Sequence, residues 1–445
     1  MTAADAPSAG PSRLLLLATV LLVAANLRPA ITVVGPLIEQ IGVENGISPS
    51  ALGLLGALPV LSLGVFSPLV HRLSARIGME RSILLGLVVL AGGTVLRSLP
   101  GGQMPSGAWT LYLGTAIIGA AIAVGNVLVP AVVKRDFPHQ VPLMTGLYTA
   151  TLVGAAAVAS GVAVPLAELV GWELTLGAAA LLALATAGIW VRRGPPPPRG
   201  ALREGPVREG PVRLGRQGLV PVEGRGAEGV TGRSGAGPAG RPGRALLRSP
   251  VAWQVTAYFG LQSAVFYVML TWLPSIQTYQ GVTPVVAGWW LSGYQAMGIV
   301  ASLVVGPLMQ RTSDQRVIAV GLSAMMGLGV AGMAFAPELL PIWCLISGFA
   351  SGATLLVSLT MVSLRARTPQ QAARLAGMAQ GIGYLVAGLG PLAAGVLVDV
   401  AGSWLPVLQV LLVVVGVQGM AGWFAGRRVF VDGAPEEGPA GGPPR

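Results

Sequence analysis

Arg28 is the residue whose type and position point most directly to chemistry. It lies inside a long apolar segment near the start of the chain, about fifteen residues after Arg13 and about eleven before Glu39. Fifteen residues of helix span roughly 22 Å, so the guanidinium cannot easily reach water at either end of such a segment. A charge buried that deeply costs several kcal/mol unless it meets a partner or a water-filled cavity.

The 17 Asp and Glu residues place no carboxylate at the depth of Arg28. They fall at predicted helix ends, in loops, in a central linker and in the C-terminal tail. An unpaired guanidinium between helices favours an anionic ligand, because it can hold such a group through two parallel hydrogen bonds. The alternative is that Arg28 donates to backbone carbonyls and only braces neighbouring helices.

Other polar side chains inside apolar segments are candidates for the same site. Thr32 follows Arg28 by one helical turn and shares its face. Asn126 would be costly to bury without a partner, and it fits ligand contact and an interhelical hydrogen bond equally well. Aromatic residues in membrane helices more often pack or anchor at the interface, so each tyrosine also fits that role. The other predicted ligand contacts are Tyr148, Tyr258, Gln262, Tyr267, Gln295, Gln380 and Tyr384.

The composition indicates a membrane protein. Of the 445 residues, 53% are hydrophobic and only 10% are charged, and the mean hydropathy is +0.71, whereas soluble domains carry roughly 25% charged residues. The apolar runs are about 18 to 27 residues long, which suits helices crossing a hydrocarbon core of about 30 Å and not the short alternating strands of a barrel.

We therefore predict an all-α membrane protein of twelve transmembrane helices, arranged as two pseudo-symmetric six-helix bundles. The predicted spans are 14–38, 49–70, 82–99, 108–133, 141–167, 172–191, 251–275, 284–309, 317–336, 339–364, 375–398 and 404–425.

The basic residues predict the orientation. With a cytoplasmic N-terminus, all of the 28 Lys and Arg except Arg28 and Arg97 lie in cytoplasmic segments, as the positive-inside rule requires; Arg97 falls on the outer side. This predicts a multi-pass protein of the cytoplasmic membrane with both termini in the cytoplasm. The net charge of +11 then reflects topology and contact with anionic lipid headgroups, and it is not evidence for nucleic-acid binding.

A central segment at 194–249 separates the bundles at 14–193 and 250–426. It consists of Gly, Pro and Arg repeats that cannot bury enough apolar surface to fold. We predict a disordered cytoplasmic linker there, acting as a flexible tether or as a basic segment on lipid. A cytoplasmic tail at 1–13 and a disordered one at 427–445 complete the chain. Because each bundle finds its partner within the chain, we expect a monomer.

The two bundles repeat one another weakly. Ser67-Pro68-Leu69-Val70-His71-Arg72 resembles Gly306-Pro307-Leu308-Met309-Gln310-Arg311, and Gly171 stands beside Gly402 at a similar offset. Two such halves can move about a single central site.

The residue types favour no enzyme and no cofactor. Cys344 is the single cysteine, which excludes an intramolecular disulfide and a cysteine metal cluster. No zinc-protease motif, phosphate loop or acidic pair falls inside an apolar segment, and intramembrane catalysis would need such groups. We predict no metal, no cofactor and no enzymatic activity. An intramembrane enzyme and a membrane sensor remain as alternatives from other classes.

Two six-helix halves joined by a cytoplasmic loop resemble the major facilitator superfamily, in which the substrate site lies near the bilayer midplane between the halves. The loop after the second span is similar to that superfamily's Gly-x-x-x-Asp-Arg-x-Gly-Arg-Arg signature, with Ala75 where the Asp is expected. The resemblance implies a gating loop. Its residues would be Arg72, Arg76, Gly78, Arg81 and the repeat counterpart Arg311.

Several strings also resemble the cyanate and 2-nitroimidazole transporter family within that superfamily. They include Asn26-Leu27-Arg28-Pro29, Pro130-Ala131-Val132-Val133-Lys134-Arg135, Gly146-Leu147-Tyr148-Thr149-Ala150 and Gln380-Gly381-Ile382-Gly383-Tyr384. The resemblance implies that Asn26 and Arg28 belong to the defining first helix, and it adds Asn26 to the predicted substrate-binding residues.

We therefore expect a secondary transporter that moves a small anionic solute, cyanate-like or another small organic or inorganic anion, by alternating access. The alternative within transport is efflux of small drug-like or nitroimidazole compounds through a mostly apolar cavity.

Overall fold

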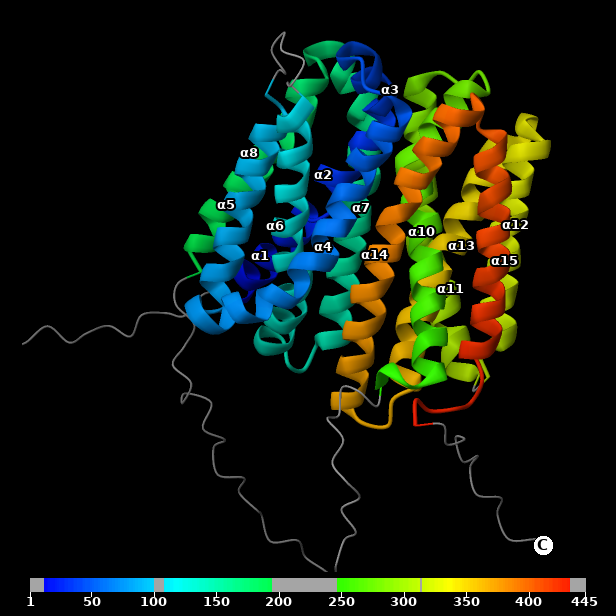
Figure 1. The fold of residues 1–445 in the computed structure, drawn as a ribbon. Helices are drawn as coiled ribbons and strands as arrows, with labels where there is room; N and C mark the ends of the chain where they lie inside the picture. Colours follow the sequence, from blue (N-terminus) through cyan, green and yellow to red (C-terminus); the bar gives the residue numbers. More distant parts are fainter. Residues whose placement is uncertain (1–11, 100–107, 194–245, 313, 433–445) are drawn as a thin grey trace, which may run out of the picture.

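The computed structural model describes residues 12–99, 108–193, 246–312 and 314–432. These residues form helices packed side by side (Figure 1), and twelve of them are long and apolar enough to cross a membrane. The all-α membrane fold predicted from the sequence is thereby confirmed. The predicted linker lies outside the described residues up to 245, as do the ends of both tails.

The N half occupies the blue-to-green side of Figure 1 and the C half the green-to-red side. The N half consists of α1 (Arg13–Asn26), α2 (Pro29–Thr32), α3 (Val34–Asn45), α4 (Pro49–Ile77), α5 (Met79–Arg97), α6 (Ala108–Asp136), α7 (Val141–Val170) and α8 (Trp172–Val191). The C half consists of α10 (Pro250–Tyr279), α11 (Pro284–Arg311), α12 (Arg316–Phe335), a short 3₁₀ helix (Pro337–Leu339), α13 (Leu340–Leu364), α14 (Pro369–Ala401) and α15 (Leu405–Ala425).

Local sequence sets many of the helix ends. α4, α10 and α14 each begin with a proline that follows a capping Ser48, Ser249 or Thr368, whose hydroxyl accepts a backbone N–H. Proline suits that position because its missing N–H would have no helical partner there. Gly78 and Gly171 have φ values of 87° and 86°, a region that favours glycine. They make the tight turns from α4 to α5 and from α7 to α8.

The first span differs from the single predicted run. It extends over Arg13–Asn45, but it is interrupted before Pro29 and again at Val33. Pro29 and Pro36 each lack the N–H that would close a helical hydrogen bond four residues back. Interrupted helices expose backbone groups near the midplane of transporters, where substrates bind.

The halves meet along α4 with α14, α7 with α11, and α3 with α10. Glycines bring the backbones together. A Cβ on Gly53 would lie 2.5 Å from the carbonyl oxygen of Pro391, and one on Gly395 would collide with the carbonyl of Pro49. Missing side chains are what allow membrane helices to approach this closely.

One end of the junction between the halves is closed. There the hydroxyl of Thr278 donates to Glu39 at 3.0 Å, and the N–H of Ser50 donates to Asp399 at 2.8 Å. Toward the end where α1 begins, a Cβ on Gly146 or on Gly377 would meet no atom within 4 Å. The halves are therefore packed at the end where α3 and α10 finish, whereas these two glycines at the other, open end have free space around them.

The chain also continues in contact beyond α15. Arg427 donates to Gln254 at 3.1 Å, the N–H of Val431 donates to the carbonyl of Arg365 at 3.0 Å, and Arg367 pairs with Asp432 at 2.9 Å. The disordered tail predicted from residue 427 thus begins with six residues that pack on the C half.

Gly395→Val tests the closed end. An overpacked contact costs about 1–3 kcal/mol, so opening should become roughly tenfold more populated. The measurement is the labelling rate of a cysteine introduced at Gln40, beside the closed end, with a membrane-impermeant maleimide in a Cys344→Ala background. Gly377→Val, on the same helix but in open space, is the matched control. Equal rates in the two variants would show that the close crossing does not hold this end shut.

Candidate functional site

Arg28 stands at the break in the first span, immediately before α2. Its side chain is half-buried, and its Cζ lies 5.1 Å from the ring centroid of Phe266 on α10. A guanidinium over an aromatic ring is stabilised by about 0.5–2 kcal/mol. Because Arg28 belongs to the N half and Phe266 to the C half, this contact crosses the junction between them.

Four tyrosines lie within electrostatic reach of the same charge. The chain has seven tyrosines, and the charge of Arg28 acts on the phenol groups of four of them: Tyr148, Tyr267, Tyr294 and Tyr384. They come from α7 of the N half and from α10, α11 and α14 of the C half. Phe266 packs edge-on against Tyr267 at 5.1 Å and lies nearly parallel to Tyr294 at 6.4 Å between centroids.

No protein carboxylate neutralises Arg28 within the described ranges. The recorded ion pairs involve other arginines, and the guanidinium of Arg28 forms no recorded hydrogen bond with a described backbone carbonyl. The sequence-based alternative, in which Arg28 braces helices through carbonyls, therefore finds no contact to support it here.

Three predicted ligand contacts gather around Arg28, and two more remain available. Tyr148, Tyr267 and Tyr384 are half-buried and lie within electrostatic reach of it. Asn126 on α6 and Gln380 on α14 are also half-buried, and their amides have no hydrogen-bond partner among the described residues. Polar groups without a protein partner and with access to solvent are free to meet a ligand.

The structure places Asn26 and Thr32 inside the N half. The Asn26 amide donates to Thr186 on α8 at 2.9 Å and to the carbonyl of Leu22. The Thr32 hydroxyl is fully buried and donates to the carbonyl of Ala156 on α7 at 3.2 Å. Both side chains therefore hold the interrupted span against its neighbours in this structure, and ligand contact remains a prediction for them.

The remaining candidates on α10 and α11 contact protein groups, and the amide oxygens of Gln262 and Gln295 have no hydrogen-bond partner among the described residues. Gln295 crosses the junction and donates to Ser160 of α7 at 2.8 Å. Gln262 donates to Ser263 at 2.7 Å. Tyr258 is fully buried and packs where a Cβ on Gly422 would lie 2.8 Å from its ring, so it belongs to the interior of the C half.

The predicted gating residues lie at the open end. Arg72, Arg76, Arg81 and Arg311 are exposed, as is Gly78 in the α4–α5 turn. The structure records no ion pair for these four arginines among described groups. Their gating role remains a prediction.

Beside that turn, a charge cluster ties the ends of α5, α6 and α8. Arg135 pairs with Glu80 and with Asp136, and Arg193 pairs with Asp136. Burial lowers the pKa of Arg193 to about 10, against the opposing effect of Glu80, so the group stays charged at neutral pH. The cluster braces the N half at the open end.

Two residues near Arg28 were not found from the sequence. Phe266 was not predicted as a site residue, because an aromatic side chain in an apolar run usually serves only to pack. Arg97 was predicted to lie on the outer side, at the end of its span, and the structure adds that its side chain is buried: it is 1% exposed, and Nη1 donates to the carbonyl of Ala30 at 2.5 Å. Its place at the end of an apolar run hid the fact that the guanidinium points back into the bundle.

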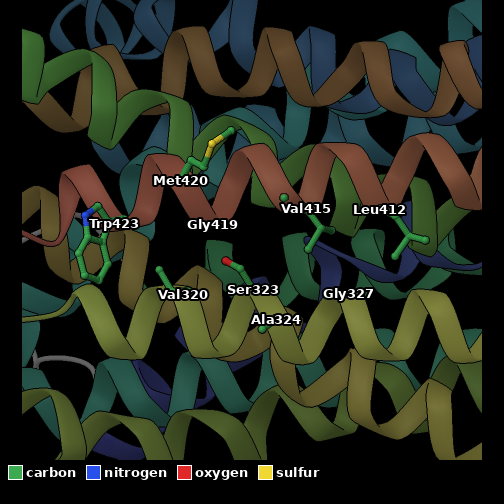
Figure 2. A pocket seen from close by; sticks show the side chains of 10 residues that line it. Val320, Ser323, Ala324, Gly327, Leu412, Val415, Gly419, Met420 and Trp423 are labelled. Atoms are coloured by element: carbon green, nitrogen blue, oxygen red, sulfur yellow. The ribbon is translucent and has the colours of Figure 1, made fainter.

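Two clefts lie away from Arg28. A groove of about 460 Å³ runs between α12 and α15 (Figure 2), and its lining is apolar except for Ser323, which already bonds Ala319 and Gln418. A second cleft of about 450 Å³ lies at the closed end and is lined by the carboxylates Glu39, Glu44 and Glu168. Neither offers a free cation to an anionic solute.

The chain belongs to the Major Facilitator Superfamily, whose sequence profile matches residues 20–337 and 276–444. It is a multi-pass secondary transporter for a small-molecule substrate, built from two six-helix halves with polar and aromatic groups gathered where they meet.

Curated relatives cover nearly the whole chain. It is 36% identical to the uncharacterized transporter YycB of Bacillus subtilis (strain 168), over 94% of each chain. It is 34% identical to the 2-nitroimidazole transporter of Escherichia coli (strain K12), over 94% of this chain and 97% of that one. It is 27% identical to the cyanate transport protein CynX of the same organism, over 88% and 91%. The family resemblance seen in the sequence is confirmed.

A solved structure shows the same fold. The crystal structure of a bacterial homologue of the human lysosomal transporter Spinster, inward-facing and unoccupied, superposes with a TM-score of 0.69 at 15% identity, over 93% of this chain and 97% of that one.

Asn26→Leu should lower the melting temperature of the purified protein, because it removes an interhelical hydrogen bond worth about 0.6–1.7 kcal/mol in a membrane helix. Asn126→Leu is the matched control: its amide has no partner among the described groups, so its melting temperature should stay within error of the parent. An equal fall in melting temperature in both variants would contradict the paired state of Asn26 and the unpaired state of Asn126.

Proposed function

We propose that this transporter moves a small anion that binds Arg28 between the two halves. The observation that carries the proposal is the Arg28 guanidinium itself, half-buried at a helix break and without a carboxylate partner in the described chain. A ligand with a negative charge completes the electrostatics of the site.

The magnitudes support a charged ligand. Placing an arginine at mid-depth costs about 2.5–3.5 kcal/mol on lenient scales. The contact with Phe266 returns only about 0.5–2 kcal/mol, and phenol groups supply dipoles and not a full charge. An anion held through two charge-assisted hydrogen bonds stabilises the guanidinium more than the Phe266 ring or the phenol dipoles do.

The aromatic surroundings favour a planar solute. Phe266, Tyr267 and Tyr294 present ring faces and edges close to the charge, and phenol hydroxyls can donate to anionic oxygen or nitrogen atoms. A flat anion can pair with Arg28 at one edge while its face packs on a ring. Small aromatic carboxylates meet both requirements, and cyanate, a linear anion, meets the requirement for charge.

The relatives are consistent with such solutes. One is named for cyanate, an anion, and one for 2-nitroimidazole, a planar heterocycle. Transport of nitroimidazoles remains a second candidate function, favoured by the 34% identity over most of the chain and by the same aromatic rings.

Alternating access follows from the position of the ligand. Arg28 and Tyr148 belong to the N half, whereas Phe266 and three of the surrounding tyrosines belong to the C half. A bound anion would therefore touch both halves and favour their closure around it. With both termini placed in the cytoplasm by the positive-inside rule, the open end faces the cytoplasm.

Uptake into proteoliposomes tests the proposal. Cyanate and benzoate should enter, and benzamide, which has the shape of benzoate without its charge, should enter poorly. Arg28→Gln should reduce anion uptake by about tenfold to a hundredfold, because a hydrogen bond to a charged group is worth about 1.5–3 kcal/mol. Anion uptake by Arg28→Lys should lie between that of the parent and that of Arg28→Gln, because an ammonium cannot form two parallel hydrogen bonds.

Arg13→Gln is the matched control. It removes one positive charge from the same span at its exposed end, and anion uptake should not change. Equal uptake of benzoate and benzamide, or an Arg28→Gln variant with parental anion uptake, would refute the anion proposal.

A further inference from the structure

Arg97 is the most deeply buried cation among the described residues of the N half. It is the last residue of α5, its side chain is 1% exposed, and Nη1 donates to the carbonyl oxygen of Ala30 at 2.5 Å. Its Nε and Nη2 have no hydrogen-bond partner within the described part of the chain. A guanidinium buried with so few contacts is costly, so the single bond that it makes needs an explanation beyond general packing.

That bond reaches the segment that carries Arg28. Ala30 lies in α2, which is only four residues long. The N–H groups of Ile31 and Thr32 both point to the carbonyl of Arg28, at 2.9 and 3.0 Å. A single turn between two breaks has little stiffness of its own, so neighbouring helices must fix its direction.

Contacts from several neighbouring helices hold α2 and Leu27, which precedes it by two residues. Arg97 reaches Ala30 from α5, Thr32 bonds the carbonyl of Ala156 on α7, and the Leu27 side chain occupies the space beside Gly125 of α6. Among these, Arg97 supplies the charge-assisted hydrogen bond to α2, and such bonds are roughly twice as strong as neutral ones.

The backbone of Arg97 is itself fixed. A Cβ on Gly114 of α6 would lie 2.5 Å from the backbone nitrogen of Arg97 and 2.7 Å from the carbonyl of Gly93. The two helices are therefore in backbone contact at this point. The guanidinium extends from a rigid crossing to a flexible segment, which is the arrangement expected of a positioning group.

We propose that Arg97 is a positioning residue, whose hydrogen bond to the Ala30 carbonyl fixes α2 and thereby aims the Arg28 guanidinium at the space between the halves. The effect of Arg97 on ligand binding rests on the proposed function of Arg28. Lysine retains a donor at this position, whereas methionine, of similar length, removes both the donor and the charge.

Benzoate uptake kinetics give the first test. Arg97→Met should raise KM about tenfold, the size of a typical coupling between neighbouring residues, with Vmax per folded protein nearly unchanged. Arg97→Lys should restore KM to within about threefold. In an Arg28→Gln background, Arg97→Met should add no further rise, because the residue that it aims is gone.

Arg365→Met is the matched control. Arg365 is also 1% exposed and also donates to backbone carbonyls, those of Ala425 and Gly426, but it lies at the end of α13 in the C half. Its loss should lower the yield of folded protein and leave KM unchanged. A parental KM in Arg97→Met, or an equal rise in Arg365→Met, would overturn the proposal.

A second measurement does not depend on the substrate. In a Cys344→Ala, Arg28→Cys protein, the reaction rate with a sulfonatoethyl methanethiosulfonate reagent should change about tenfold on adding Arg97→Met, and not on adding Arg365→Met. If the labelling rate changes but the Arg28→Gln variant keeps parental anion uptake, Arg97 positions residue 28 and the anion site is rejected. An unchanged rate would reject the positioning whatever the substrate.

Discussion

A positive charge on an interrupted helix, with no described carboxylate beside it, is the constraint on which the rest of this structure depends. Arg28 sits before a four-residue turn between two breaks in the first span, and aromatic rings from the opposite half are its nearest stabilising groups. Dipoles and quadrupoles reduce the cost of burying a guanidinium but do not cancel its charge. Under the proposed function, a bound anion supplies the missing negative charge.

The junction between the halves suits a transporter because it combines close fit with few strong bonds. Glycine positions let α4 and α14 touch backbone to backbone, while the polar links at the closed end are single hydrogen bonds such as Thr278 to Glu39 and Ser50 to Asp399. A single hydrogen bond to a charged group contributes about 1.5–3 kcal/mol at most, and both of these are exposed to solvent. Because the closed end is held by so few polar bonds, a ligand that contacts both halves can shift the balance between conformations.

Much of this could be predicted from the sequence, because hydropathy and charge placement report on the membrane directly. The helix count, the two halves and the unusual depth of Arg28 all follow from them. The direction of side chains does not: these helices are apolar on every face, so periodicity cannot say that Tyr267 lies near Arg28 while Tyr258 is buried inside the C half. The sequence predicted neither the break before Pro29 nor the hydrogen bond from Arg97 to Ala30.

Direct observation of a bound anion is the sharpest test of the account. Crystals of the protein soaked with 4-iodobenzoate allow the iodine to be located by its anomalous signal, and the carboxylate by difference density. The carboxylate should lie on the Arg28 guanidinium, with the ring against Phe266 between the two halves. A guanidinium that is instead paired with a protein carboxylate or turned toward lipid, with the iodine elsewhere, would contradict it.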